Sequence, residues 1–230
     1  MDSAVIFDVD GVLLELTAAE EDIFFETFRA RYGIEGLSRD WDSYRTRNDV
    51  DIIAEILEAH GQPGSERAPA ASHYVGLFSE ALELRRVSPV AIAGARHLLS
   101  LLAPRHAVGI ATANLLSVAS RRLAALSLWE PVSALAFGAE GGGAKRHTVA
   151  RAIAATGLPR DRVVYVGDNL NDVDAGLFNG VHFIGFAADP AHRRRLAAAG
   201  ARHTASNHDE TDRKSTRLNS SHGYISYAVF

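Results

Sequence analysis

Polar residues able to do chemistry follow three apolar segments of the sequence. They are Asp8 and Asp10, Thr112 and Asn114, and Asp168 and Asp172. Carboxylates brought together repel one another and raise one another's pKa values, so a site built from them needs a cation. Mg²⁺ meets that need, because it is a hard cation held by carboxylates, waters and phosphate oxygens. A magnesium site is therefore expected if these segments converge.

Another charged residue, Lys145, follows the run Gly141–Gly143 at the start of a helical pattern. An ammonium group there can neutralise both a carboxylate nucleophile and an incoming phosphate. The glycine run is not a P-loop, because the pattern Gly-x-x-x-x-Gly-Lys-[Ser/Thr] is absent. The lysine fits a site that handles phosphate by charge.

The elements that must position these residues alternate between apolar strands and helices. Strands are predicted at 3–9, 106–112, 132–137, 162–166, 181–185 and 203–206, and helices at 91–103, 115–126, 145–156, 170–178 and 190–199. Repeated strand–helix units predict a parallel sheet with right-handed crossovers and helices on both faces. Ligands of such sheets bind at the carboxyl ends of the strands. The three polar segments are thus expected to meet in one crevice.

Residues 17–85 show helical spacing and almost no strand signal. Ile23, Phe24 and Phe28 recur at helical intervals, as do Ile52 and Ile56, and a third helical stretch runs over 70–84. The predicted fold class is α/β: a doubly wound parallel sheet core interrupted after its first strand by an all-helical insert. The expected domains are 1–15 and 87–211 for the core and 16–86 for the insert.

Residues 212–230 differ from the rest in being basic, serine-rich and without period. The segment is similar to the in-frame translation of a common sequencing-library adapter, in which Gly223 and Tyr224 correspond to a variable index. It is expected to be an artefact and is left out of the predicted fold.

Composition excludes several classes of function. The chain has 230 residues, a formal net charge of −4 and no cysteine. It therefore has no disulfide framework, thiol nucleophile or cysteine-bound zinc, and no basic field that would favour nucleic acid. No secretory signal is visible, and no apolar run approaches the roughly 20 residues of a membrane span. We expect a cytoplasmic protein, monomer or homodimer, with no nucleic-acid or membrane partner.

Four motifs in order resemble those of the haloacid dehalogenase-like superfamily, in particular members with a helical cap after the first strand, such as phosphoglycolate phosphatases and β-phosphoglucomutases. The motifs are Asp8-x-Asp10-Gly11, Thr112, Lys145, and Gly167-Asp168-x-x-x-Asp172, and the resemblance covers residues 3 to about 206. It departs from the family at Val12, where many members have threonine, and in the sequence Ala-Lys-Arg around Lys145. The second departure leaves Lys145 and Arg146 as alternatives, of which Lys145 is preferred as the compact ammonium.

The resemblance implies a role for each matching residue. Asp8 would be the nucleophile that forms an aspartyl-phosphate, and Asp10 the general acid and base. Thr112 would bind phosphate and Lys145 would stabilise charge. The implied magnesium ligands are Asp8, Asp10 through its carbonyl, Asp168 and Asp172, with Asn169 as a secondary candidate. The implied substrate-binding residues are Gly11, Arg47, Thr112, Ala113, Asn114 and Lys145.

Asp10 separates branches of this superfamily, since dehalogenating members lack the second aspartate. The implied activity is magnesium-dependent hydrolysis of a small phosphorylated metabolite, with a phosphomutase as the alternative enzyme. A non-catalytic binding protein on the same fold is the alternative of another class.

Three polar residues keep two interpretations each. Arg47 either reads a substrate carboxylate or second phosphate, or belongs to a solvated turn in which Asn48 caps the following helix. Asn114 either contacts substrate or caps the helix that begins near Leu115, and Asn169 either supports the metal or caps the helix after its motif.

Overall fold

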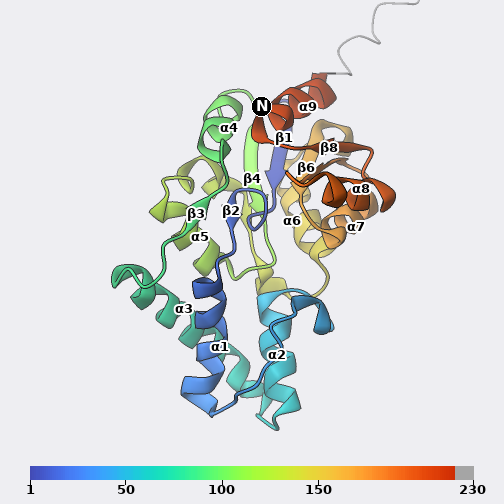
Figure 1. The fold of residues 1–230 in the computed structure, drawn as a ribbon. Coiled ribbons are helices and arrows are strands. Elements are labelled where there is room, and N and C mark those ends of the chain that lie inside the picture. Colours follow the sequence, from blue (N-terminus) through green and yellow to red (C-terminus); the bar gives the residue numbers. More distant parts are fainter. Residues whose placement is uncertain (221–230) are drawn as a thin grey trace, which may run out of the picture.

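The sheet of this protein is parallel and places β1 near its centre. The structure is a computed structural model that describes residues 1–220, and Figure 1 shows its fold. Six strands of this described part form one sheet in the order β5-β4-β1-β6-β7-β8, with every neighbouring pair parallel. They are β1 (Ala4–Phe7), β4 (Ala107–Ala111), β5 (Ala136–Phe137), β6 (Val163–Gly167), β7 (His182–Phe186) and β8 (His203–Ala205). The predicted doubly wound sheet is confirmed.

Both faces of β1 are buried, which explains its uninterrupted apolar sequence. Val5 and Phe7 pack on the face covered by α4 and α9, whereas Ala4 and Ile6 pack on the face covered by α6, α7 and α8. The helices are α4 (Ala95–Leu102), α5 (Leu116–Ala125), α6 (Lys145–Thr156), α7 (Leu170–Asn179), α8 (Pro190–Ala198) and α9 (His208–Ser220). Because Phe7 lies beside the ends of β4 and β6, the chain leaves β1 between those two strands.

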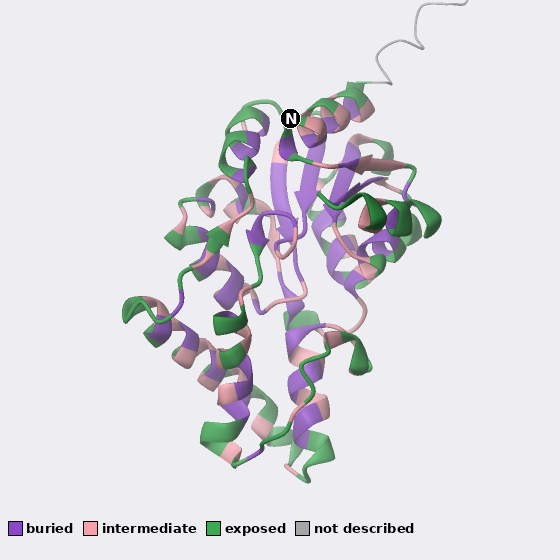
Figure 2. Cartoon of the chain, in the orientation of Figure 1, coloured by how far each residue is buried: buried purple, intermediate pink, exposed green. Residues whose placement is uncertain are grey.

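The helices of the insert form a cap with its own apolar core. They are α1 (Ala18–Tyr32), α2 (Asp49–Ala59) and α3 (Arg67–Glu83). Phe24 packs edge-to-face against Phe28 and Tyr74, with ring centroids 5.5 and 5.1 Å away. Figure 2 shows the buried faces of these helices turned toward one another and their outer faces exposed. The predicted all-helical cap is therefore present.

The two chain segments that join cap and core pair as a short antiparallel ribbon. Its strands are β2 (Leu14–Glu15) and β3 (Val90–Ala91). Neither strand was predicted, because two residues are too few to show the period of a strand. The domain boundaries given above, at 15/16 and 86/87, stay predictions.

One predicted strand is largely replaced by a 3₁₀ helix. Most of the strand predicted over 132–137 is the 3₁₀ helix η3 (Glu130–Leu135), which has Pro131 in its first turn, so that prediction is wrong except at β5. Other 3₁₀ turns are η1 (Trp41–Ser43), η2 (Gly64–Glu66), η4 (Ala139–Gly141) and η5 (Arg160–Arg162).

No helix within residues 1–220 has the length and apolar character needed to cross a membrane.

Residues 212–220 were left out of the predicted fold, yet they continue α9 to Ser220. The buried positions of α9 recur every three or four residues, but they are His208, Thr211, Ser215 and Asn219, so no apolar period reveals the helix. In the described part of the chain, the side-chain amide of buried Asn219 has no hydrogen-bond partner, which is costly in a packed helix. The adapter origin stays a prediction, and residues 221–230 lie outside the described residues.

Candidate active site

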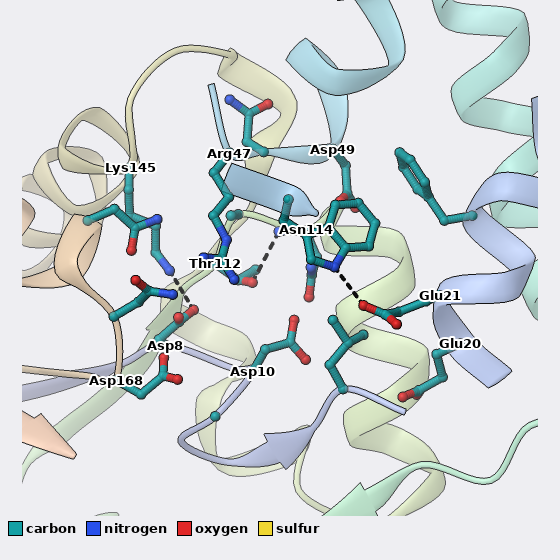
Figure 3. A pocket seen from close by; sticks show the side chains of 18 of the residues that line it. Asp8, Asp10, Glu20, Glu21, Arg47, Asp49, Thr112, Asn114, Lys145 and Asp168 are labelled. Carbon is teal, nitrogen blue, oxygen red and sulfur yellow. Dashed lines mark hydrogen bonds and ion pairs between the residues drawn. The ribbon is translucent and has the colours of Figure 1, made fainter. Parts of the chain in front are cut away.

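A cavity of about 300 Å³ lies between the carboxyl ends of β1, β4 and β6 and the cap. The predicted site residues that line it are Asp8, Asp10, Gly11, Arg47, Thr112, Ala113, Asn114, Lys145, Asp168 and Asn169. Asp172 is fully buried behind Lys145. Figure 3 shows the core acids on one side of the cavity and Arg47 and Asp49 of the cap on the other. The structure thus brings the predicted residues together.

Asp8 lies at the end of β1, is 6% exposed, and faces Lys145. Its Oδ1 is 2.7 Å from Nζ of Lys145 and accepts a hydrogen bond from the amide of Val9. Burial raises the pKa of Asp8 well above its ordinary value; Lys145 opposes the rise, and the nearby charges of Asp172 and Asp168 add to it. The positive charge of Lys145 alone therefore does not offset the burial of the Asp8 carboxylate and the repulsion from Asp172 and Asp168.

Lys145 begins α6 and joins Asp8 to Asp172, whose Oδ1 is 3.0 Å from Nζ. Burial works against the charged ammonium, but the carboxylates of Asp172 and Asp8 outweigh it, so the pKa of Lys145 is raised. Asp172 also accepts hydrogen bonds from the Tyr165 hydroxyl at 2.6 Å and the Asn169 amide at 3.0 Å. These contacts hold the Lys145 ammonium against Asp8.

Arg146, the alternative to Lys145, points away from the cavity. Its guanidinium lies over the ring of Phe178 and is 3.8 Å from Asp174. The compact ammonium of Lys145 is therefore the cation that faces Asp8.

Three carboxylates fit a divalent cation. Asp8, Asp168 and Asp172 each offer an oxygen within 4.8 Å of the others. Burial and the charge of Asp172 raise the pKa of Asp168 to about 7. Oxygen donors crowded in this way, two of them on buried residues and one on the half-buried Asp168, suit Mg²⁺, which neutralises their mutual repulsion.

Gly11 makes the close approach of Asp168 possible. Its φ is +73°, and a Cβ added there would lie 2.0 Å from Oδ2 of Asp168. The DxDG motif therefore needs glycine at this position for both backbone conformation and space.

The loop after β4 contacts the cap. The amide of Asn114 donates to Oγ1 of Thr112 at 3.2 Å, and the carbonyl of Ala113 accepts from the amide of Asp49 at 3.0 Å. Oδ2 of Asp49 accepts from the amide of Leu115 at 2.7 Å. Burial raises the pKa of Asp49 to about 7, although the bond from Leu115 opposes the rise. The N-terminus of α2 is thus anchored on the Thr112 loop.

The two asparagines with open interpretations behave differently. Asn169 is the N-cap of α7, and its side chain accepts from the amide of Leu170 at 2.7 Å. The N-cap of α5 is Leu115, while Oδ1 of Asn114 accepts from Arg122 at 3.2 Å. Capping is thus observed for Asn169 and not for Asn114, and the substrate contact of Asn114 stays a prediction.

Asn48 caps α2 by accepting from the amide of Asp51, and it also donates to the carbonyl of Gly143 at 2.8 Å. Arg47 lines the cavity and donates to Asp42 at 2.9 Å. Arg45 pairs instead with Glu58 on the cap surface. Arg47 thus lines the cavity and Arg45 does not, and the substrate contact of Arg47 stays a prediction.

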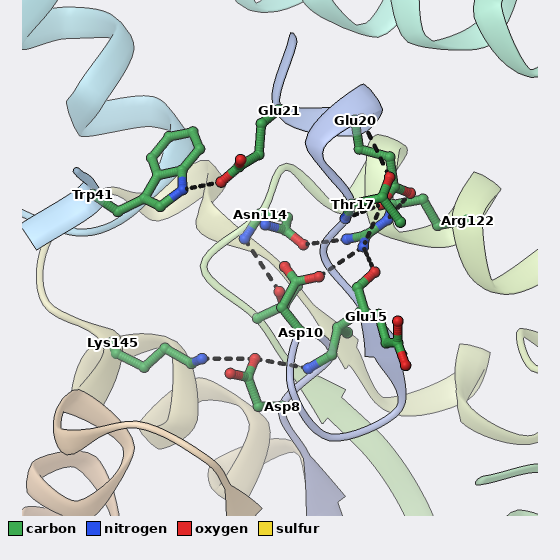
Figure 4. Close-up of polar contacts among 12 residues, drawn as sticks. Asp8, Asp10, Glu15, Thr17, Glu20, Glu21, Trp41, Asn114, Arg122 and Lys145 are labelled. Carbon is green, nitrogen blue, oxygen red and sulfur yellow. Dashed lines mark hydrogen bonds and ion pairs between the residues drawn. The ribbon is translucent and has the colours of Figure 1, made fainter. Parts of the chain in front are cut away.

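The sequence did not reveal Arg122 as a site residue, yet it contacts Asp10, the predicted general acid and base. It is 2% exposed, and its Nη2 is 2.7 Å from Oδ1 of Asp10 (Figure 4). The signal that could have found it is its spacing: it follows buried Val118 by four residues and Ala119 by three, so it lies on the apolar face of α5.

Comparisons with known proteins identify the family and the fold. Residues 3–179 match the family model described as haloacid dehalogenase-like hydrolase. No curated protein matches the sequence. Solved structures with a similar fold include CbbY from Rhodobacter sphaeroides, in complex with phosphate, at 20% identity and a TM-score of 0.69, covering 90% of this chain and 95% of that one.

Two further structures have the same fold. A protein from Bacteroides vulgatus provisionally named a β-phosphoglucomutase is 18% identical, with a TM-score of 0.68 and coverage of 95% of this chain and 89% of that one. A predicted phosphatase from Clostridium acetobutylicum is 20% identical, with a TM-score of 0.67 and coverage of 93% and 98%. At these identities the likeness shows the fold alone.

Proposed function

Since the chain belongs to the haloacid dehalogenase-like hydrolase family, we propose that it hydrolyses a small phosphomonoester, with Asp8 as nucleophile and Mg²⁺ as cofactor. One observation carries the proposal. The buried carboxylate of Asp8 lies at the end of β1, 2.7 Å from the Lys145 ammonium, on the wall of a cavity that it shares with Asp10 and Asp168.

In the first step, an oxygen of Asp8 attacks phosphorus. The bond from Asp8 to phosphorus forms, the bond from phosphorus to the ester oxygen breaks, and Asp10 gives its proton to the departing alcohol. Lys145 stabilises the charge that develops around the phosphoryl group, and the Thr112 hydroxyl with nearby backbone amides binds its oxygens. The products are the alcohol and an aspartyl-phosphate.

In the second step, water attacks the same phosphorus. Asp10, now ionised, takes a proton from the water, and the bond between phosphorus and Asp8 breaks. Inorganic phosphate leaves, and both aspartates return to their starting states. Enclosure of the cavity by the cap limits bulk water to the molecule that reacts.

Asp8 and Asp168 would hold Mg²⁺, with Asp172 acting directly or through Lys145. The backbone carbonyl of Asp10 is the further ligand that the family resemblance implies. When bound, the ion supplies positive charge to phosphate oxygens. The raised pKa of Asp168 and the crowding around Asp8 support this assignment, because a cation would relieve both.

The size and walls of the cavity support a small substrate. Its volume is about 300 Å³, and its cap side includes the aromatic residues Phe24, Trp41 and Tyr74. CbbY, which shares the fold, has been solved with phosphate and, in a variant, with xylulose-1,5-bisphosphate. Both support a small phosphorylated metabolite as the substrate class here.

A phosphomutase is the second candidate, favoured by the fold shared with the protein named a β-phosphoglucomutase. A mutase would use the same aspartates but return the phosphoryl group to a sugar. Isomerisation of a sugar phosphate without release of inorganic phosphate would identify it.

The test is a screen of phosphorylated metabolites with MgCl₂, measuring released phosphate, with Asp8→Asn as the control. We expect turnover of at least one monoester by the wild type and none by the variant. Full activity in a folded Asp8→Asn protein would overturn the mechanism. Absence of turnover and of isomerisation across the screen would favour a non-catalytic role.

A further inference from the structure

The guanidinium of Arg122 is buried at the junction of core and cap. Its side chain extends from α5 of the core toward the segment that joins β2 to the cap helix α1 (Figure 4). An arginine that is 2% exposed must have its charge balanced and its donors bonded, because an unpaired buried charge is strongly disfavoured.

Every nitrogen of this guanidinium contacts an acceptor. Nε donates to Oε1 of Glu20 at 2.8 Å, and Nη1 donates to Oδ1 of Asn114 at 3.2 Å. Nη2 donates to the carbonyl of Glu15 at 3.0 Å and is 2.7 Å from Oδ1 of Asp10. One side chain therefore joins the acid Asp10, the β2 connection, the cap helix α1 and the loop after β4.

Glu20 is fixed on the cap side of this junction. Its Oε2 accepts from the amide of Thr17 at 2.9 Å and from the Thr17 hydroxyl at 3.0 Å, which closes a capping box at the start of α1. Nη2 of Arg122 is 3.3 Å from the same oxygen. Because Glu20 can turn neither away from Thr17 nor away from the cation, it anchors the guanidinium.

Asp10 is held differently from Asp8. Its side chain is 25% exposed and lines the cavity, and its Oδ1 lies 2.7 Å from Nη2 of the buried guanidinium. The contact is an ion pair and not a hydrogen bond: it draws one carboxylate oxygen toward the guanidinium, whose Nη2 donates to Glu15 and Glu20, and the Asp10 carboxyl still lines the cavity. Proton transfer depends on the alignment of this carboxyl with the ester oxygen.

We propose that Arg122 is a positioning residue for Asp10, with Glu20 as its anchor in the cap. The proposal rests on the proposed function, in which Asp10 protonates the departing alcohol. Arg122 touches neither the phosphoryl group nor the ester; it acts through the orientation of the Asp10 carboxylate.

If Arg122 served only to stabilise the fold, its replacement would have a different effect on activity. The choice of leaving group distinguishes a positioning role from a purely structural one. An alkyl alcohol departs with a proton from Asp10, whereas p-nitrophenolate is a stable anion and departs without one. A positioning defect therefore slows cleavage of an alkyl ester and spares p-nitrophenyl phosphate. A general loss of structure slows both.

The experiment measures kcat/KM for glycerol 1-phosphate, or the best alkyl ester of the metabolite screen, and for p-nitrophenyl phosphate. This ratio reports the steps up to departure of the alcohol, so hydrolysis of the aspartyl-phosphate does not enter it. The variants are Arg122→Gln, Arg122→Lys and Glu20→Gln in the full chain. Arg121→Gln is the matched control, because its exposed side chain on the same helix bonds the carbonyl of Ser117.

We expect Arg122→Gln to lower kcat/KM for the alkyl ester about 10²-fold and that for p-nitrophenyl phosphate by less than about fivefold, in line with the usual contribution of general acid catalysis. Arg122→Lys and Glu20→Gln should show smaller losses with the same selectivity, and Arg121→Gln none. If Arg122→Gln does not fold, as thermal unfolding would reveal, the Lys variant and Glu20→Gln decide the question.

Equal losses on both esters, or no loss on either, would overturn the role of Arg122 while leaving the proposed function intact. Wild-type turnover of both esters and its loss in Asp8→Asn are measured first. Failure of those measurements would overturn the proposed function itself, so the two failures are distinguishable.

Discussion

Replacement of Gly11 by alanine should weaken magnesium binding more than it weakens the fold. Gly11 has φ +73°, and an added Cβ would lie 2.0 Å from Oδ2 and 2.3 Å from Cγ of Asp168. Ordinary contacts of a Cβ begin near 3.4 Å. The Asp168 carboxylate must therefore retreat by more than about 1 Å, since backbone and carboxylate cannot interpenetrate.

Two effects of known size combine in this variant. The left-handed backbone conformation costs an alanine about 1–2 kcal/mol. Displacement of a group that holds or orients a metal ligand commonly lowers metal affinity or activity about 10–100-fold. We expect the MgCl₂ concentration for half-maximal turnover to rise at least about tenfold in Gly11→Ala, by the same principle.

The matched control is Gly33→Ala at the end of α1. Gly33 has φ +65°, similar to Gly11, but a Cβ there would have no atom within 4 Å in the described structure. Both variants should lose similar stability in urea unfolding without magnesium, and only Gly11→Ala should need more magnesium for turnover. An unchanged magnesium dependence in Gly11→Ala would refute the assignment of Asp168 as a ligand.

Three other outcomes are expected. Lys145→Met should lower kcat at least about 10²-fold and destabilise the fold by about 3–5 kcal/mol, because it leaves buried Asp8 and Asp172 without their cation. Steady-state kinetics measure the first effect and urea unfolding the second. The control variant Arg146→Met should change neither quantity. Burial raises the pKa of Asp49 from 3.8 to about 7. The stability from this carboxyl is thus complete below its unfolded pKa and is lost as pH rises through the folded value, so Asp49→Asn should be more stable than wild type near pH 8 and not near pH 4. A pH-independent difference in urea midpoints would contradict that sign. Chelation of divalent cations should stop turnover and added MgCl₂ should restore it; unchanged rates in chelator would count against a metal role.

The parts of the fold that the sequence predicts well are those with a strong local signal. The helix expected over 145–156 is α6 to the residue, and β1 is a buried run between two neighbouring strands. Asp8, Thr112 and Asp168 meet because strands of one parallel sheet present their carboxyl ends at the same edge. That geometric rule needs no knowledge of side-chain packing.

The features that escaped prediction depend on contacts far apart in the chain. Arg122 appears in sequence as one of two adjacent arginines on a helix. Its spacing predicts that it is buried, but its role follows from Asp10 and Glu20, more than a hundred residues away. The β2–β3 ribbon likewise pairs residues 14–15 with 90–91. Pro131 and the packing of Leu135 against Gly109 favour η3 where an apolar run alone predicted a strand.

Direct detection of a phosphoryl group on Asp8 tests the central claim. The enzyme is mixed with MgCl₂ and the best substrate of the screen, quenched in acid during turnover, and digested for peptide mass spectrometry. We predict phosphorylation of the peptide that contains Asp8, at a level that decays when substrate is exhausted and that is absent in Asp8→Asn. Turnover by the wild type with no label on that peptide, together with retained activity in Asp8→Asn, would contradict Asp8 as the nucleophile.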